Sequence, residues 1–121
     1  MNTNATASLV GVAIVLFAVP AAADTWTGAY GNTINATYTD GRTAKVYVEA
    51  DHSYTIKLPN GTVLKGMWSD ANGQSCFKLT DPPAKPGDKI PCFPVKAYKV
   101  GDSFSGEDST GKFTSVIVAG R

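Results

Sequence analysis

The chain has 121 residues, of which 43% are hydrophobic and 17% charged, with eleven basic and ten acidic side chains. The net charge of +1 is spread evenly, which argues against a protein that binds nucleic acid or an anionic membrane through a basic stripe. The length suits one small domain, which buries a modest share of its surface and gains from a covalent cross-link.

The first 23 residues are expected to be an export signal. The apolar run Leu9–Val19 precedes Pro20 and the small residues Ala21–Ala23, a pattern typical of signal-peptidase cleavage. A membrane anchor is the alternative, but the run is about half of the roughly 20 apolar residues that cross a bilayer. We therefore expect cleavage directly before Asp24, no membrane anchor afterwards, and a periplasmic or secreted protein.

Residues 24–121 are expected to form a single all-β domain. Strand-like segments recur about every eight to twelve residues, each bounded by Gly, Pro, Asn or Asp, and none has a helical period. This spacing predicts a small antiparallel meander of seven to nine strands, closed as a barrel or a tight sandwich. The expected strands are residues 25–30, 33–38, 43–50, 54–58, 62–69, 75–80, 90–100, 103–106 and 112–118.

One hairpin near the middle of the chain has a predicted register. A two-residue turn would bring a lysine onto the apolar face of the hairpin. A three-residue loop at 59–61, with glycine in third place, instead pairs Ile56 with Leu64 and Tyr54 with Gly66. The longer loop is therefore expected, and the ring of Tyr54 should cover the bare backbone of Gly66.

The preceding hairpin follows the same rule. A three-residue loop at 39–41, again with glycine in third place, pairs Ile34 with Val46 and Ala36 with Ala44. Alternation along these strands and the next one then gives the expected core. It comprises Val46, Val48, Tyr54, Ile56, Leu58, Leu64, Trp68, Phe77 and Leu79.

The two cysteines, Cys76 and Cys92, are expected to form one disulfide. An exported chain with two cysteines most simply pairs them, and the Cys-x-x-Cys spacing of a redox site is absent. Closing a loop of about 15 residues contributes on the order of 3 kcal/mol in the chain-entropy model. The bridge would enclose a Pro-rich loop, residues 81–89, which can form neither helix nor central strand.

No motif in the chain specifies a reaction. His52 is the only histidine, and its neighbours Asp51 and Ser53 share its turn, where a catalytic relay cannot form. It is therefore expected at an exposed hairpin tip. One histidine and two paired cysteines leave no zinc or copper ligand set, and no metal or cofactor is expected. Acidic residues in expected loops are candidates for hydrolysis or calcium binding, although Asp is common in turns. They are Asp70, Asp81, Asp88, Asp102, Glu107 and Asp108.

Binding candidates lie on the expected outer face and in the Pro-rich loop. Strand alternation points Tyr47 outward, and with Met67 and Val63 it would form an apolar patch. Lys85 and Asp88 lie among prolines that restrict the loop, which lowers the entropy lost on docking to a partner. The remaining aromatic residues are expected to fill the interior and to leave little room for a ligand.

Four motifs together resemble a protein family. Residues 26–30 (Trp-Thr-Gly-Ala-Tyr), 51–56, 66–68 (Gly-Met-Trp) and 100–104 resemble small exported bacterial envelope proteins with a lipocalin-like β-barrel. The chain departs from their Asp-Gly-x-Tyr hairpin at His52, and it lacks the Cys-x-x-Cys of the copper-linked members, so no metal role is implied. The chain resembles the periplasmic lysozyme inhibitors more loosely. Their functional Ser-Gly-x-x-Tyr loop has no clear match in this sequence, so no inhibitory residues are implied.

These observations favour an exported, non-enzymatic β-domain of the bacterial envelope that binds a protein partner or a small ligand. Neutral charge and the lack of an assembled catalytic set support it, and no nucleic-acid partner is expected. Two alternatives stay open. One is inhibition of a lysozyme or protease through the Pro-rich loop, and the other is hydrolysis by loop carboxylates.

Overall fold

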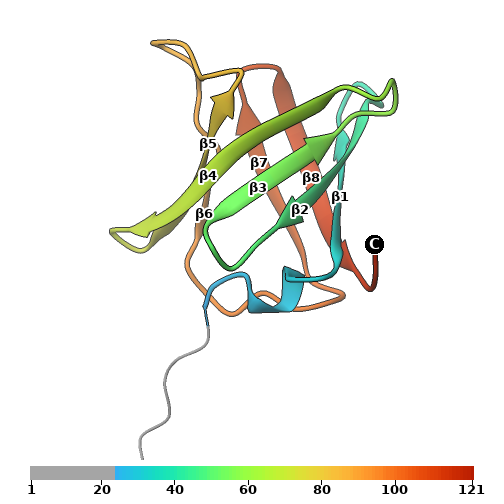
Figure 1. Ribbon diagram of the computed structural model, residues 1–121, viewed down its shortest axis with the longest axis vertical. Helices are drawn as coiled ribbons and strands as arrows, with labels where there is room; N and C mark the ends of the chain where they lie inside the picture. Colours follow the sequence, from blue (N-terminus) through green and yellow to red (C-terminus); the bar gives the residue numbers. More distant parts are fainter. Residues whose placement is uncertain (1–23) are drawn as a thin grey trace, which may run out of the picture.

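The computed structural model describes residues 24–121, so the expected leader lies outside the described part. These residues form one antiparallel sheet in the order β6-β5-β4-β3-β2-β1-β8-β7, curled into a nearly closed barrel (Figure 1). Its strands are β1 (Thr33–Tyr38), β2 (Thr43–Val48), β3 (Ser53–Lys57), β4 (Val63–Ala71), β5 (Gln74–Asp81), β6 (Cys92–Pro94), β7 (Ser103–Asp108) and β8 (Gly111–Val118). The predicted all-β barrel of seven to nine strands is confirmed. Within the described part, no helix is long and apolar enough to span a membrane.

The predicted strand at 25–30 is wrong. The segment contains a 3-10 helix, η2 (Thr27–Ala29), in which the amide of Ala29 donates to the carbonyl of Trp26 at 2.7 Å. Trp26 and Ala29 are both fully buried, and their spacing of three matches a helical turn better than the alternation of a strand. The segment is rich in aromatic residues, which favour a strand, but it forms one buried helical turn.

The predicted strand at 90–100 is much shorter in the structure. Only β6 (Cys92–Pro94) pairs with β5, because Pro91 and Pro94 have no amide to donate to a ladder. The chain then turns beneath the barrel, where the amide of Tyr98 donates to the carbonyl of Thr25 at 3.0 Å. This segment packs against the N-terminal turn and does not extend the sheet.

Both predicted hairpin registers are confirmed. Ile34 pairs with Val46 between β1 and β2, and Ile56 pairs with Leu64 between β3 and β4. The glycine in third place of each loop has a positive φ, 94° in the first and 91° in the second. These two hairpins form the part of the barrel wall that contains many residues of the candidate site.

Side chains join the two edge strands, β6 and β7, and so complete the barrel. The rings of Phe93 and Phe104 meet edge to face at 5.0 Å between centroids. Just before β6, the amide of Lys89 donates to Ser109 Oγ at 2.6 Å, and its ammonium lies 3.0 Å from Glu107 Oε1. The predicted Cys76–Cys92 disulfide is present and ties β6 to β5.

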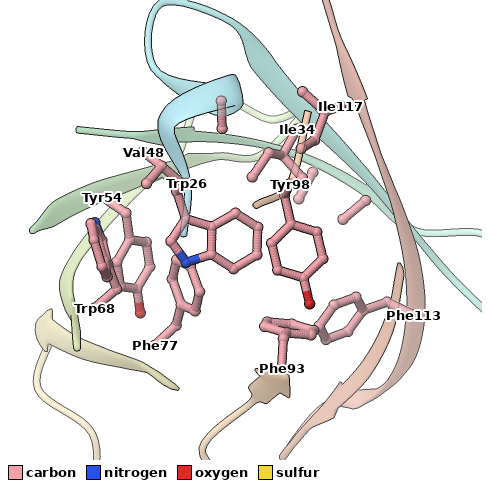
Figure 2. Close-up of a cluster of buried hydrophobic side chains, with 13 residues drawn as sticks. Trp26, Ile34, Val48, Tyr54, Trp68, Phe77, Phe93, Tyr98, Phe113 and Ile117 are labelled. Atoms are coloured by element: carbon pink, nitrogen blue, oxygen red, sulfur yellow. The ribbon is translucent and has the colours of Figure 1, made fainter. Parts of the chain in front are cut away.

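One end of the barrel is filled by aromatic side chains, and we call it the closed end (Figure 2). Trp26 stacks on Tyr98 with centroids 4.4 Å apart and meets Phe77 edge to face at 5.2 Å. The indole Nε1 of Trp26 donates to the buried Ser75 Oγ at 2.7 Å, so its polar atom is satisfied. The η2 turn and residues 95–102 lie across this end (Figure 1).

Candidate functional site

The opposite end of the barrel is open and contains a cavity of about 480 Å³, which we call the mouth cavity. Its rim comes from the four loops that join β1 to β2, β3 to β4, β5 to β6 and β7 to β8 (Figure 1). A smaller space of about 70 Å³, which we call the inner space, continues inward as far as Trp26 and Phe93 at the closed end. Apolar side chains form most of the cavity wall. They are Ile56, Leu58, Leu64, Phe77, Leu79, Ile90 and Pro91.

The cavity explains why part of the predicted core is only half-buried. Val48, Tyr54, Trp68 and Phe77 are buried as predicted. The other predicted core side chains face inward but border empty space. Val46 lies along the inner space, and the mouth cavity is bordered by Ile56, Leu58, Leu64 and Leu79. The expectation of little room for a ligand is therefore wrong, because the aromatic rings gather at the closed end.

Tyr54 lies on the inner wall of the mouth cavity, by which we mean the part that also borders the inner space. Its ring lies over Gly66 as predicted, so close that a Cβ at Gly66 would fall 2.5 Å from the Tyr54 Cζ. The side chain meets Phe77 edge to face at 5.0 Å and is 3% exposed, yet its hydroxyl has no hydrogen-bond partner among residues 24–121. Burial, and then the nearby charge of Asp108, raise the pKa of Tyr54 above its ordinary value. The hydroxyl is therefore neutral and, within the described part of the chain, unpaired.

Asp108, at the end of β7, is the carboxylate of the inner wall. Its Oδ2 accepts a hydrogen bond from the Tyr38 hydroxyl at 2.6 Å, and its Oδ1 accepts from the amide and the hydroxyl of Thr110 at 2.7 and 2.6 Å. Burial and this hydrogen bond raise the pKa of Tyr38 to about 12. Both side chains border the mouth cavity and the inner space.

The two cations at the rim are each paired with a nearby carboxylate. The guanidinium of Arg42 lies 4.3 Å from the ring centroid of Tyr38 and forms an ion pair with Asp40 at 2.7 Å. Lys89 is paired with Glu107 across the barrel seam. Arg42 also donates from Nη2 to the carbonyl of Thr110 at 2.7 Å, and neither cation forms an ion pair with Asp108.

The structure separates the two binding candidates of the Pro-rich loop. Asp88 lines the mouth cavity, and its Oδ2 accepts a hydrogen bond from the amide of Lys85 at 2.8 Å. Lys85 itself is exposed at the loop tip and does not line the cavity. The loop thus contributes to the rim through its second half.

Tyr47 and Met67 lie on the outer face of the barrel, as their alternation predicts, but on opposite sides of β3. Tyr47 is half-buried beneath the cations of Lys57 and Arg121, at 5.7 and 5.0 Å from its ring centroid. Met67 is 46% exposed and pairs with Lys78 on β5. Lysines therefore interrupt the predicted apolar patch, and neither residue approaches the mouth cavity.

His52 occupies the tip of the β2–β3 turn, at the end of the barrel away from the mouth. It is exposed with a φ of 75°, and its ring stacks on Trp68 at 3.9 Å between centroids. Its Nδ1 lies 3.0 Å from the Trp68 carbonyl, whereas Asp51 accepts its hydrogen bonds from Ser53. The predicted exposed position is confirmed, and the stacking on Trp68 is an additional finding.

The acidic residues are divided between the two ends of the barrel. At the closed end, Asp70 accepts from the Thr25 hydroxyl at 2.6 Å, and Asp102 accepts from the amide of Lys99 at 3.0 Å. Asp88 and Asp108 lie at the mouth. Among residues 24–121, no group of three or more His, Cys, Asp or Glu side chains is placed to hold a metal ion.

The comparisons with protein-family models, with curated proteins and with solved structures found no match for the chain. Function is therefore inferred from the residues of the cavity. Sequence reasoning missed Tyr38 as a site residue, named Asp108 only among the acidic loop residues, and placed Tyr54 only in the core. A usable signal was present, since Tyr38 and Tyr54 are polar-tipped residues at inward positions of their strands.

Proposed function

We propose that this protein is an exported, non-enzymatic binding protein that holds a small, mainly apolar ligand in the mouth cavity. The observation that carries the proposal is the cavity of about 480 Å³, whose wall is mainly apolar and in which Tyr38 and Thr110 bond the carboxylate of Asp108. Ligand sites commonly have volumes of about 300–1,000 Å³, apolar walls and a few placed polar groups. The expected leader and the disulfide support a location in the bacterial envelope or outside the cell.

The barrel also has the mechanical properties that such a role requires. A packed closed end and a cross-linked β6 hold the wall strands in place, so the cavity is formed before a ligand arrives. A preformed site loses little conformational entropy on binding, which favours affinity. The resemblance to lipocalin-like envelope proteins agrees with this arrangement.

The other predicted functions have weaker support. The Pro-rich loop is exposed, but its end is tied to the rim by Lys89, which bonds Ser109 and Glu107, so the loop is less free to enter another protein's active site. Catalysis by loop carboxylates would require acids that converge. Asp70 and Asp102 lie at the closed end, and the two acids at the mouth, Asp88 and Asp108, each accept a hydrogen bond from a backbone amide of their own loop.

A fluorescence titration with N-phenyl-1-naphthylamine, a neutral apolar dye that brightens in apolar surroundings, tests the proposal. The processed, disulfide-bonded protein should enhance its emission saturably with one site per chain. Leu64→Trp, which fills the cavity from the wall, should abolish the enhancement. Val63→Trp is the matched control, because the neighbouring Val63 points outward and is 45% exposed. Absence of saturable binding, or equal binding by both variants with unchanged melting curves, would contradict the proposal.

A further inference from the structure

The inner wall of the cavity carries an unusual set of polar groups. Three polar side chains border both the mouth cavity and the inner space: Tyr38, Tyr54 and Asp108. All other side chains shared by the two spaces are apolar, namely Ile56, Phe77 and Pro91. A ligand that enters with its apolar body against the walls will therefore meet these three oxygen-bearing groups.

These groups differ in which of their donor and acceptor positions are already occupied. The Tyr38 hydroxyl donates its proton to Asp108, so its oxygen can only accept from a ligand. Each carboxylate oxygen can accept about two hydrogen bonds, and Oδ2 of Asp108 has Tyr38 as its one donor among residues 24–121. The Tyr54 hydroxyl has no partner among residues 24–121, and it can donate or accept, although Tyr54 as a whole is only 3% exposed. The wall thus offers mostly acceptors to an incoming group.

The charge at this wall is negative. The two rim cations, Arg42 and Lys89, form their ion pairs with Asp40 and Glu107, and no ion pair among residues 24–121 includes Asp108. A half-buried carboxylate beside an apolar cavity attracts a cation strongly and repels an anion, because the surroundings screen charge poorly.

We infer that the ligand is an apolar amine, whose protonated amino group binds Asp108 and Tyr54 while its hydrocarbon part fills the mouth cavity. An ammonium group has three N–H donors, one for each of the oxygens of Asp108, Tyr38 and Tyr54. A carboxylate at the same place would face the charge of Asp108 and could be met only by the Tyr54 proton. The inference rests on the proposed function and names the ligand class of that cavity.

Competition among three ligands of equal chain length tests the inference. Dodecylamine, dodecanol and dodecanoate, each below its micelle concentration at pH 7, compete with N-phenyl-1-naphthylamine for the unaltered protein. The amine is almost fully protonated at this pH, since alkyl amines titrate near the lysine value of about 10.4. Dodecylamine should displace the dye at about tenfold lower concentration than dodecanol, as expected for one charge-assisted hydrogen bond, and dodecanoate should be the weakest.

Variants then assign the preference to named groups. Asp108→Asn keeps the shape of the side chain and should remove about tenfold of the advantage of the amine over the alcohol. Tyr54→Phe should weaken the amine and the alcohol alike, by about threefold to tenfold. Asp51→Asn is the control, because this exposed carboxylate lies in the β2–β3 turn away from the mouth, and it should leave the ranking as it is.

The outcomes separate the two proposals. If the dye does not bind, the proposed function fails. If the dye binds but dodecanoate or dodecanol equals dodecylamine in the unaltered protein, only the amine inference fails. The same holds if Asp108→Asn remains folded and keeps the full preference for the amine. The ranking in the unaltered protein decides the question even where a variant does not fold.

Discussion

The closed end and the mouth of the barrel are built on the same strands but are packed differently. At the closed end, Trp26 contacts other aromatic rings on several sides and its indole nitrogen is hydrogen-bonded. At the mouth, wall side chains such as Leu58 are half-buried and the Tyr54 hydroxyl has no partner among residues 24–121. The difference comes from what covers each end, since η2 and residues 95–102 fill one and only loops edge the other. Stability should therefore be concentrated at the closed end, which leaves the mouth free to bind.

Trp26→Ala gives the largest expected effect. Deleting this fully buried ring should lower the free energy of unfolding by about 3–5 kcal/mol, a large part of the stability of so small a domain. Leu58→Ala at the mouth should cost only about 1 kcal/mol, because the side chain already borders open space. Urea unfolding of both variants compares the two ends directly. Equal losses would show that stability is shared evenly along the barrel.

Removal of the disulfide is expected to come next. The double variant Cys76→Ser with Cys92→Ser should lose about 3 kcal/mol, because the unfolded chain is no longer constrained between β5 and β6. Urea unfolding of the unaltered protein with and without reducing agent measures the same quantity. The bridge encloses part of the rim, so dye binding should weaken as β6 loosens. Dye binding that is fully retained after reduction would show that the mouth is independent of this cross-link.

The hairpins of the wall could be predicted from the sequence because their information is local. A side-chain period of two and a glycine in third place of the loop specify the pairing of Ile56 with Leu64. The strand predicted at residues 25–30 was wrong for the opposite reason, because the structure of this segment depends on distant residues. Trp26 is aromatic and so favours a strand locally, but its buried position depends on Tyr98, distant in the chain. Such long-range packing leaves no trace in a short window of sequence.

The candidate site was predicted in part. Asp88 was named for its loop and does line the cavity, whereas Tyr47 and Met67 lie outside it. Inward alternation identified Tyr54 as core but could not show that its hydroxyl lacks a partner within residues 24–121. A cavity is space that side chains leave unfilled, and it depends on volumes contributed by strands from the whole barrel.

Gly66→Ala tests how tightly the inner wall is built. The added methyl group would meet the Tyr54 ring and the carbonyl of Lys78, both at 2.5 Å, and should cost about 1–3 kcal/mol through overpacking. Tyr54 should move, so displacement of the dye by dodecylamine should also weaken. Met67→Ala, at the neighbouring exposed position, should change stability by less than about 0.5 kcal/mol. Thermal melts and the dye competition supply both measurements, and an unchanged Gly66→Ala protein would mean that the wall yields easily.

The smallest expected effect compares one tyrosine from each end at alkaline pH. Burial and a carboxylate acceptor raise the pKa to about 12 both for Tyr38 at the mouth and for Tyr30 near the closed end. Each folded-state pKa lies above the ordinary value of 10.0, so the stability that each contributes is complete below pH 10 and is lost as the pH rises through 12. Tyr38→Phe and Tyr30→Phe should therefore each flatten the alkaline fall in the free energy of unfolding.

Salt distinguishes the two tyrosines. The Tyr30 hydroxyl bonds Asp24 at 3.2 Å in an exposed position, whereas the Tyr38 hydroxyl bonds Asp108 at 2.6 Å in a part-buried one. Added salt screens exposed charges more than buried ones, so 1 M salt, with a Debye length of about 3 Å, should reduce the contribution of Tyr30 more than that of Tyr38. Tyrosinate absorbance and urea unfolding between about pH 9 and 12 measure both. Equal salt sensitivity would show that the carboxylate of Asp108 is as well solvated as that of Asp24, which would also remove the electrostatic basis for its preference for an amine.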